Sequence, residues 1–411
     1  MSARIAFSER SWPYLAACAL PWLLCAGQRS VRRLAGLATH RRSESGYYRF
    51  LSDGKWRMQM FFKCLFDLVV KTFRIAGLTL VLDDTLSPKW GLGIFGTAFH
   101  FDHTARPRAG YIWGHNWVVL AVVVQVGAWA WVALPFWVAL YRPKKTCAGQ
   151  EFRTRHEMAA EALALVRGWF SGPILLLADG AYANGSLAGP ARTLDIHMVS
   201  RLRADARLRE AEPRTQPKGK RGRKPQHGPW LPRLSHLARQ RSKFKTFSAA
   251  IYGKTVTLRL REVVAWWPPL RCEVKVVIAR DPKRPKRVAY LVTTDLLLTA
   301  VEVVEAFSRR WTIEQMFSVA KNQLGFDSAE VRKERSVVRH AAMGLAMITW
   351  VEVWTRTFRR YLSARPFAAK LATLREEAVT ETIFASGPRR KGSHKIAGTL
   401  ATLFSAATRA A

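Results

Sequence analysis

A stretch of 25 residues without a single charge most limits what this chain can fold into. Residues 117–141 read WVVLAVVVQVGAWAWVALPFWVALY. A helix of this length and polarity could span a bilayer. The stretch is also rich in Val and Trp, and Gly127 and Pro135 interrupt it, as in two central strands of a covered sheet that turn near Gly127. Taken alone, the segment allows either a membrane anchor or two buried strands.

Basic residues exceed acidic residues along the whole chain. The 66 Lys and Arg against 29 Asp and Glu give a formal net charge of +37 over 411 residues. This excess is larger than solubility requires and predicts a polyanionic partner, for which nucleic acid is the default. The cysteines are widely spaced and form no CxxC pair, which is typical of buried thiols in a reducing cytosol.

Changes of pattern divide the chain into five predicted regions. Residues 1–75 look helical with basic interruptions and are predicted to bind DNA. Residues 76–199 read as three strands, a helix and a further strand, and form the first part of an α/β core. Residues 200–294 contain strand-like pieces after a run of Pro, Gly, Lys and Arg, and are predicted to be a β-rich insertion. Residues 295–360 return to helices of the core, and residues 361–411 read as a basic C-terminal tail.

Acids are scarce, so those that follow apolar strand patterns are informative. Asp83 and Asp84 follow LTLVL, and Asp179 follows ILLLA. A carboxylate is costly to bury unless it is paired, protonated or bound to a cation. Three such groups meeting at one point would hold Mg²⁺ or Mn²⁺ through oxygen ligands, and two ions can activate water and stabilise a leaving oxygen in phosphodiester chemistry.

The third acid lies on a predicted helix, residues 305–325. At about 100° per residue, Arg310, Glu314 and Lys321 fall on one narrow arc beside the apolar stripe. A surface helix would normally scatter its charges over the far side. One acid between two bases at the edge of a buried face therefore suggests a site and not a solvated surface.

Each acid also has a local explanation. Asp84 could cap a turn, Asp179-Gly180 is a common turn dipeptide, and Glu314 could pair with Arg310 one helical turn away. The combination of three acids in such settings, within so basic a chain, favours a shared site over three separate local roles.

These motifs resemble those of the DDE transposases of bacterial insertion sequences. The spacing Phe307-x2-Arg310-x3-Glu314-x6-Lys321 is similar to that family's Y-x2-R-x3-E-x6-K signature, with Phe in place of Tyr. LDDT (82–85) resembles the D-x-T around its first aspartate, and LLLADGAYAN (175–184) resembles its second. The β-rich stretch before Glu314 matches an insertion in the family, and the resemblance covers roughly residues 45–350.

The resemblance implies an α/β fold with an RNase H-like, retroviral-integrase-type core, a β-rich insertion and an N-terminal helical region. It implies Asp83, Asp179 and Glu314 as catalytic ligands of two Mg²⁺ or Mn²⁺ ions, with Asp84 as the alternate to Asp83. Neighbouring strand residues point to opposite faces, so only one of the two can easily join the site. The implied reaction is cleavage by water at the element's ends, followed by attack of the freed 3′-hydroxyl on target DNA.

The partners implied are the element's terminal inverted repeats and target DNA, with a homodimer in the synaptic complex. The location implied is the bacterial cytoplasm, in association with the nucleoid. The alternatives are an inactive DNA-binding relative or fragment, and a membrane protein anchored by residues 117–141, which leaves the acids unexplained. The predicted DNA-binding residues lie on the helix and in the basic loop: Arg310, Lys321, Lys218, Lys220, Arg221, Arg223 and Lys224.

Overall fold

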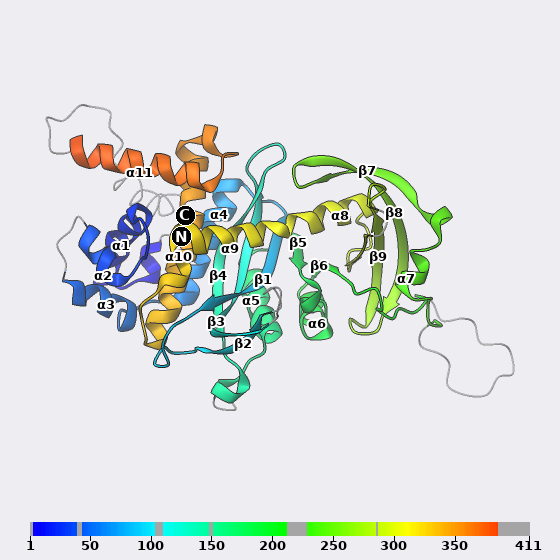
Figure 1. The fold of residues 1–411 in the computed structure, drawn as a ribbon, viewed down its shortest axis with the longest axis horizontal. Helices are drawn as coiled ribbons and strands as arrows, with labels where there is room; N and C mark the ends of the chain where they lie inside the picture. Colours follow the sequence, from blue (N-terminus) through cyan, green and yellow to red (C-terminus); the bar gives the residue numbers. More distant parts are fainter. Residues whose placement is uncertain are drawn as a thin grey trace.

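One mixed sheet with helices packed on it makes up most of the protein (Figure 1). The computed structural model describes residues 3–38, 43–102, 110–147, 151–211, 228–284 and 287–384. Within them the strands are β1 (Leu78–Pro88), β2 (Ala98–Asp102), β3 (Gly110–Gln125), β4 (Trp131–Tyr141), β5 (Ile174–Ala178), β6 (Ile196–Arg201), β7 (Lys245–Ile251), β8 (Lys254–Trp267), β9 (Cys272–Arg280) and β10 (Val288–Thr293). The α-helices are α1 (Trp12–Leu24), α2 (Val31–Leu37), α3 (Glu44–Ser52), α4 (Met58–Phe73), α5 (Arg155–Trp169), α6 (Gly185–Thr193), α7 (Leu234–Leu237), α8 (Ala300–Arg309), α9 (Trp311–Leu324), α10 (Glu334–Phe358) and α11 (Phe367–Phe384).

The strand order of the described sheet is β2-β3-β1-β5-β6-β10-β9-β8-β7, with β4 also paired to β3. The pairs β1–β3, β3–β4 and β2–β3 are antiparallel, whereas β1–β5 and β5–β6 are parallel. The parallel strands are connected through helices, as short turns cannot join them. This mixed α/β arrangement is consistent with an RNase H-like core.

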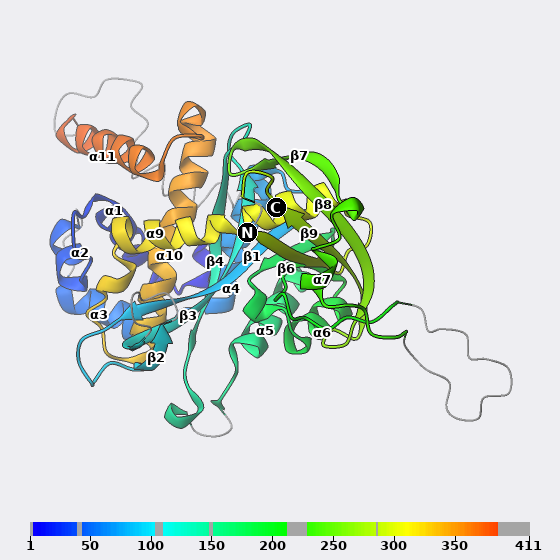
Figure 2. The ribbon, with the colours of Figure 1, turned by 45° about the vertical axis from the view of Figure 1, so that its right-hand side comes forward.

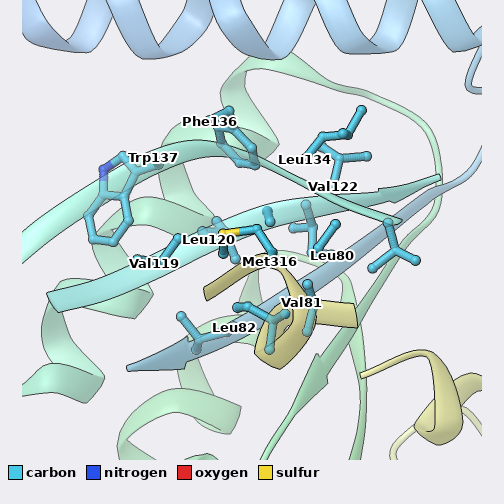
Figure 3. Packing of buried hydrophobic residues seen from close by; sticks show 14 of the residues in the cluster. Leu80, Val81, Leu82, Val119, Leu120, Val122, Leu134, Phe136, Trp137 and Met316 are labelled. Atoms are coloured by element: carbon cyan, nitrogen blue, oxygen red, sulfur yellow. The ribbon is translucent and has the colours of Figure 1, made fainter. Parts of the chain in front are cut away.

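The uncharged segment 117–141 forms strands and not a membrane anchor. It supplies most of β3 and all of β4, which pair with a bulge between Leu120 and Ala121. Figure 3 shows side chains of β1, β3 and β4 packed together with Met316 of α9. A sheet covered on both faces explains why these strands carry near-continuous apolar runs. In the part of the chain that the structure describes, no helix combines the length and apolarity needed to cross a bilayer.

The predicted β-rich insertion continues the core sheet. β10 pairs antiparallel with β6, with Leu291 opposite Arg201 and Thr293 opposite Val199. β9, β8 and β7 follow in order, and they lie at the end of the molecule away from α1–α3 (Figures 1 and 2). The sequence pattern predicts these strands but not their hydrogen bonds to the core. Most of the basic loop, including Lys218, Lys220, Arg221, Arg223 and Lys224, lies outside the described residues.

The predicted helix over residues 305–325 is two helices that meet at Arg310. α8 begins with a capping box between Thr299 and Glu302 and ends at Arg309, and α9 starts at Trp311. Arg310 keeps right-handed helical angles (φ −53°, ψ −35°), so α8 and α9 follow each other across the molecule (Figure 1). Gly325 ends α9 in the left-handed conformation (φ 63°), which glycine adopts at low cost.

The expectation of a basic tail over residues 361–411 is wrong for its first part. Residues 367–384 form α11, which packs against α1 and α10. A buried ion pair joins α11 to α10: Lys370 Nζ donates to both carboxylate oxygens of Glu352, at 2.8 and 2.7 Å. The pattern of α11 is weakly amphipathic, and this buried lysine stands where an apolar residue would be expected.

Candidate active site

Asp83 and Asp179 lie side by side on neighbouring parallel strands. The register of β1 and β5 pairs Leu82 with Ala178, so each aspartate is the residue that follows the last pair of the parallel ladder. Residues in register on adjacent strands point to the same face, which brings the two carboxylates together. β1 does not end at the acids as its pattern predicts, because its antiparallel pairing with β3 continues to Pro88.

Glu314 reaches this face from the first turn of α9, and Arg310 connects it to the strand. Arg310 donates from Nη1 to Oδ2 of Asp83 at 3.1 Å and from Nη2 to Oε1 of Glu314 at 2.6 Å. The Arg310 side chain is only 13% exposed. One guanidinium therefore ties a β1 carboxylate to a helix carboxylate 231 positions later in the chain.

The environment of Asp83 disfavours its charged form. Burial is the largest cause and raises the pKa of Asp83 to about 7. The backbone N–H of Asp84 and the Arg310 guanidinium act in the opposite direction, whereas the charges of Asp84 and Asp179 raise the pKa further. A cation placed between Asp83 and Asp179 would favour the ionised carboxylates.

Asp84 points to the opposite face of β1. Its Oδ1 accepts a hydrogen bond from the Tyr182 hydroxyl at 2.9 Å, and its Oδ2 accepts one from Arg155 Nη1 at 2.7 Å. Burial and the neighbouring Asp84 carboxylate raise the pKa of the Tyr182 hydroxyl well above its ordinary value, so it remains a donor. Of the two adjacent aspartates, the structure brings Asp83 to the face shared with Asp179 and Glu314.

Arg155 and Tyr182 are the residues near the site that sequence reasoning missed. Tyr182 is the aromatic of the ADGAY motif, so the motif offered a signal, although not for contact with Asp84. Arg155 lies at the start of α5 among other charged residues, and no pattern distinguishes it. Together they hold Asp84 away from the other acids.

The two predicted DNA-contact residues on the helix have partners inside the protein. Arg310 binds the two carboxylates, and Lys321 Nζ donates to the backbone carbonyl of Leu86 at 2.5 Å. Both side chains thus brace α9 against β1. Lys89, the first residue after β1, is buried, and its Nζ donates to the backbone carbonyl of Asp327 at 2.7 Å.

The three predicted metal ligands offer suitable donors but are not gathered into a cage. Within the described ranges, no group of three or more His, Cys, Asp or Glu side chains is placed to hold a metal ion. Carboxylate oxygens are the donors that Mg²⁺ and Mn²⁺ prefer, and a positive group already sits between Asp83 and Glu314. The donor chemistry fits such an ion, and these three residues are the ones that would hold it.

The raised pKa of Asp83 predicts a pH dependence of stability in EDTA. The folded protein holds this proton more tightly than the unfolded chain, so the group's contribution is full below about pH 4 and is lost as pH rises through about 7. Wild-type protein should therefore lose stability relative to Asp83→Asn as pH rises from 5 to 8, measured by urea unfolding. Parallel curves for the two proteins would contradict the assignment. Asp84→Asn should still lose stability as pH rises, because burial is the largest cause of the raised pKa of Asp83, but less than wild type, because the charge of Asp84 contributes to it.

The fold and the acids define a mixed α/β protein with a carboxylate site at the end of the parallel β1–β5 pairing. Residues 7–264 match the model of the family described as DDE superfamily endonuclease, and the chain belongs to this family. The match includes Asp83, Asp84 and Asp179 and ends before Glu314. No curated protein matches the chain.

Proposed function

We propose that this protein is a transposase of the DDE class, which cuts DNA at the ends of an insertion sequence and transfers the strands into target DNA. One observation carries the proposal: Asp83 in β1 and Asp179 directly after β5 lie next to each other where the parallel pairing of these strands ends, and Arg310 links Asp83 to Glu314. Membership of the DDE superfamily of endonucleases supports nuclease-type chemistry on DNA. The RNase H-like interpretation of the core and the signature around Glu314 support the finer assignment.

In the proposed site, Asp83, Asp179 and Glu314 would hold two Mg²⁺ or Mn²⁺ ions through carboxylate oxygens. Such ions activate an attacking water or hydroxyl and stabilise the leaving oxygen. Asp179 and Asp83 are fixed by the sheet, whereas Glu314 is positioned by the first turn of α9. Arg310 orients Glu314, and its charge opposes the rise that burial causes in the pKa of Asp83.

DNA is the proposed partner, in line with the net charge of +37. Lys321 uses one donor on the Leu86 carbonyl, and an ammonium has two further donors for a phosphate. Arg310 lies beside Asp83 and Glu314, and a guanidinium suits phosphate oxygens. The basic loop with Lys218, Lys220, Arg221, Arg223 and Lys224 remains a predicted backbone contact, and pairing of two element ends would require a homodimer.

Nicking of a supercoiled plasmid that carries the DNA flanking the gene tests this function. Wild-type protein should convert it to open-circular and linear forms with Mg²⁺ or Mn²⁺ and not with EDTA. Glu314→Gln keeps the side-chain size but loses a charged ligand, so it should show no cleavage. Glu302→Gln is the matched control, because Glu302 caps the start of α8 and is not one of the proposed ligands, and it should cleave like wild type.

The same assay distinguishes the second candidate, an inactive DNA-binding relative. This candidate is favoured by the spacing of the acids, which are not gathered into a three-ligand group within the described residues. A wild-type protein that binds the plasmid in a gel-shift assay but does not nick it with either ion would support the inactive relative and overturn the proposed enzyme.

A further inference from the structure

A single guanidinium occupies carboxylate oxygens that the proposed metal ions require. Arg310 Nη1 donates to Oδ2 of Asp83 at 3.1 Å, and its Nη2 donates to Oε1 of Glu314 at 2.6 Å. The second oxygen of Asp83, Oδ1, accepts from the backbone N–H of Asp84 at 2.9 Å. Both oxygens of Asp83 and one oxygen of Glu314 are therefore engaged by groups of the protein itself.

The Arg310 guanidinium and a divalent cation compete for these carboxylates. Both bind the same oxygens, and two positive groups within a few ångströms repel each other. A guanidinium stays protonated in proteins, so Arg310 cannot lose its charge to make room for an ion. An ion that binds Asp83 and Glu314 must therefore displace the Arg310 side chain.

Displacement of Arg310 by an ion alone leaves a charge without a partner. The Arg310 side chain is 13% exposed, against 20% for Asp83 and 34% for Glu314. A largely buried charge is costly to leave unpaired, and this cost lowers the affinity of the ion. A DNA phosphate that took Arg310 alone would leave the carboxylates facing one another without a cation.

An exchange of both partners keeps every charge paired. Divalent ions replace the guanidinium at the carboxylates, and a DNA phosphate, whose oxygens match the fork of a guanidinium, replaces the carboxylates at Arg310. The backbone N–H of Arg310 donates to the carbonyl of Phe307 at 3.1 Å, and its carbonyl accepts from the N–H of Ile313 at 3.1 Å. Only the side chain has to move, because these bonds hold the junction of α8 and α9 in place.

We propose that Arg310 is an electrostatic switch that couples metal binding at the carboxylates to the binding of DNA. Without DNA, the arginine competes with ions for Asp83 and Glu314 and keeps their affinity low. When a phosphate binds the guanidinium, the carboxylates are released to the ions. By thermodynamic linkage, ions and DNA strengthen each other's binding by the same factor. The inference rests on the proposed function, because it assigns regulation to the proposed metal site.

Binding of Mn²⁺ in the absence of DNA tests the switch. Electron paramagnetic resonance of the free ion gives the affinity. Arg310→Met keeps a long side chain but removes the competing charge, so it should bind Mn²⁺ about tenfold more tightly than wild type, within the range typical of coupled sites. Equal or weaker binding by a folded Arg310→Met protein, with folding checked by circular dichroism, would overturn the switch.

Arg309→Met is the matched control. Arg309 is the preceding residue and carries the same charge, but its guanidinium lies 4.0 Å from Glu305 and stacks on Trp131 at 4.1 Å. Because it contacts none of the proposed ligands and salt screens more distant charges, its loss should change Mn²⁺ affinity by less than about twofold. A tenfold gain in this variant as well would assign the effect to net charge and overturn the switch.

A second measurement adds DNA and does not depend on the folding of any variant. A duplex of the DNA flanking the gene should tighten Mn²⁺ binding by wild type about tenfold, after subtraction of the Mn²⁺ that the free duplex binds. No gain in the wild-type protein would overturn the switch. A folded Arg310→Met protein should gain less from DNA than wild type, because it has no arginine to release, and an equal gain would also overturn it.

The results separate the switch from the enzyme. A protein that shows the coupling and its loss in Arg310→Met, but does not nick the plasmid, would support the switch and reject only the enzyme. A protein that nicks the plasmid, but whose Arg310→Met variant binds Mn²⁺ no more tightly than wild type, would keep the enzyme and reject only the switch.

Discussion

The Asp83→Asn variant is expected to lose DNA cleavage, while Asp84→Asn keeps a reduced but measurable rate. These aspartates are adjacent in sequence, but Asp83 shares a face with Asp179 and Glu314, whereas Asp84 binds Arg155 and Tyr182 on the other face. Asp84 acts only through the strand that it steadies, so its loss should cost no more than the roughly 10- to 100-fold typical of groups that orient a ligand. Loss of Asp83 should exceed this and reduce cleavage below detection.

The comparison needs rates and stability for both variants. Initial nicking rates with Mn²⁺ give the activity, and urea unfolding gives the free energy of unfolding. Asp84→Asn should be less stable than wild type by about 1–3 kcal/mol, because it weakens charge-assisted hydrogen bonds to a partly buried group. An active Asp83→Asn protein, or an inactive but well-folded Asp84→Asn protein, would reverse the assignment of the metal ligand.

The Lys370→Met variant is expected to show the largest loss of stability. The Lys370 and Glu352 side chains are 1% and 4% exposed, and each is the other's partner between α11 and α10. Burial raises the pKa of Glu352, and Lys370 acts to lower it. Removing the lysine leaves a buried carboxylate unpaired, and such changes cost about 3–5 kcal/mol. Urea unfolding followed by circular dichroism measures the effect.

Two further variants show whether the unpaired charge is the cause. Glu352→Leu combined with Lys370→Met removes both charges and should restore wild-type stability or exceed it by up to about 4 kcal/mol. Arg359→Met is the surface control: Arg359 pairs with Glu377 of α11, the two side chains are 35% and 26% exposed, and its loss should cost less than about 1 kcal/mol. A Lys370→Met protein as stable as the Arg359→Met protein would contradict the argument.

The sequence predicts those parts of the structure that depend on local pattern. The apolar run at 117–141 with its break at Gly127 corresponds to β3 and β4, because burial on both faces demands continuous apolar residues. The acids after apolar runs predict that carboxylates lie near strand ends, and Asp179 does follow β5. The family match adds the class of enzyme.

Features that depend on contacts between distant segments could not be predicted. Helical spacing aligns Arg310 with Glu314, but only the packing of α9 on β1 turns Arg310 toward Asp83 and away from solvent. The pairing of β10 with β6 has no counterpart in either strand's own pattern. The placement of α11 involves two ion pairs with residues outside it, Lys370 with Glu352 and Glu377 with Arg359, and the pattern of α11 itself predicts neither partner.

The pairing of β10 with β6 means that the chain leaves the core and returns to it at neighbouring positions. The backbone N–H of Leu202, just past β6, donates to the carbonyl of Tyr290 at 2.8 Å. An excursion whose two ends touch can be lengthened, shortened or exchanged without rethreading what lies on either side of it. Related chains could therefore differ in the length of the segment that forms β7, β8 and β9, while Asp83, Asp179 and Glu314 keep their distances from one another.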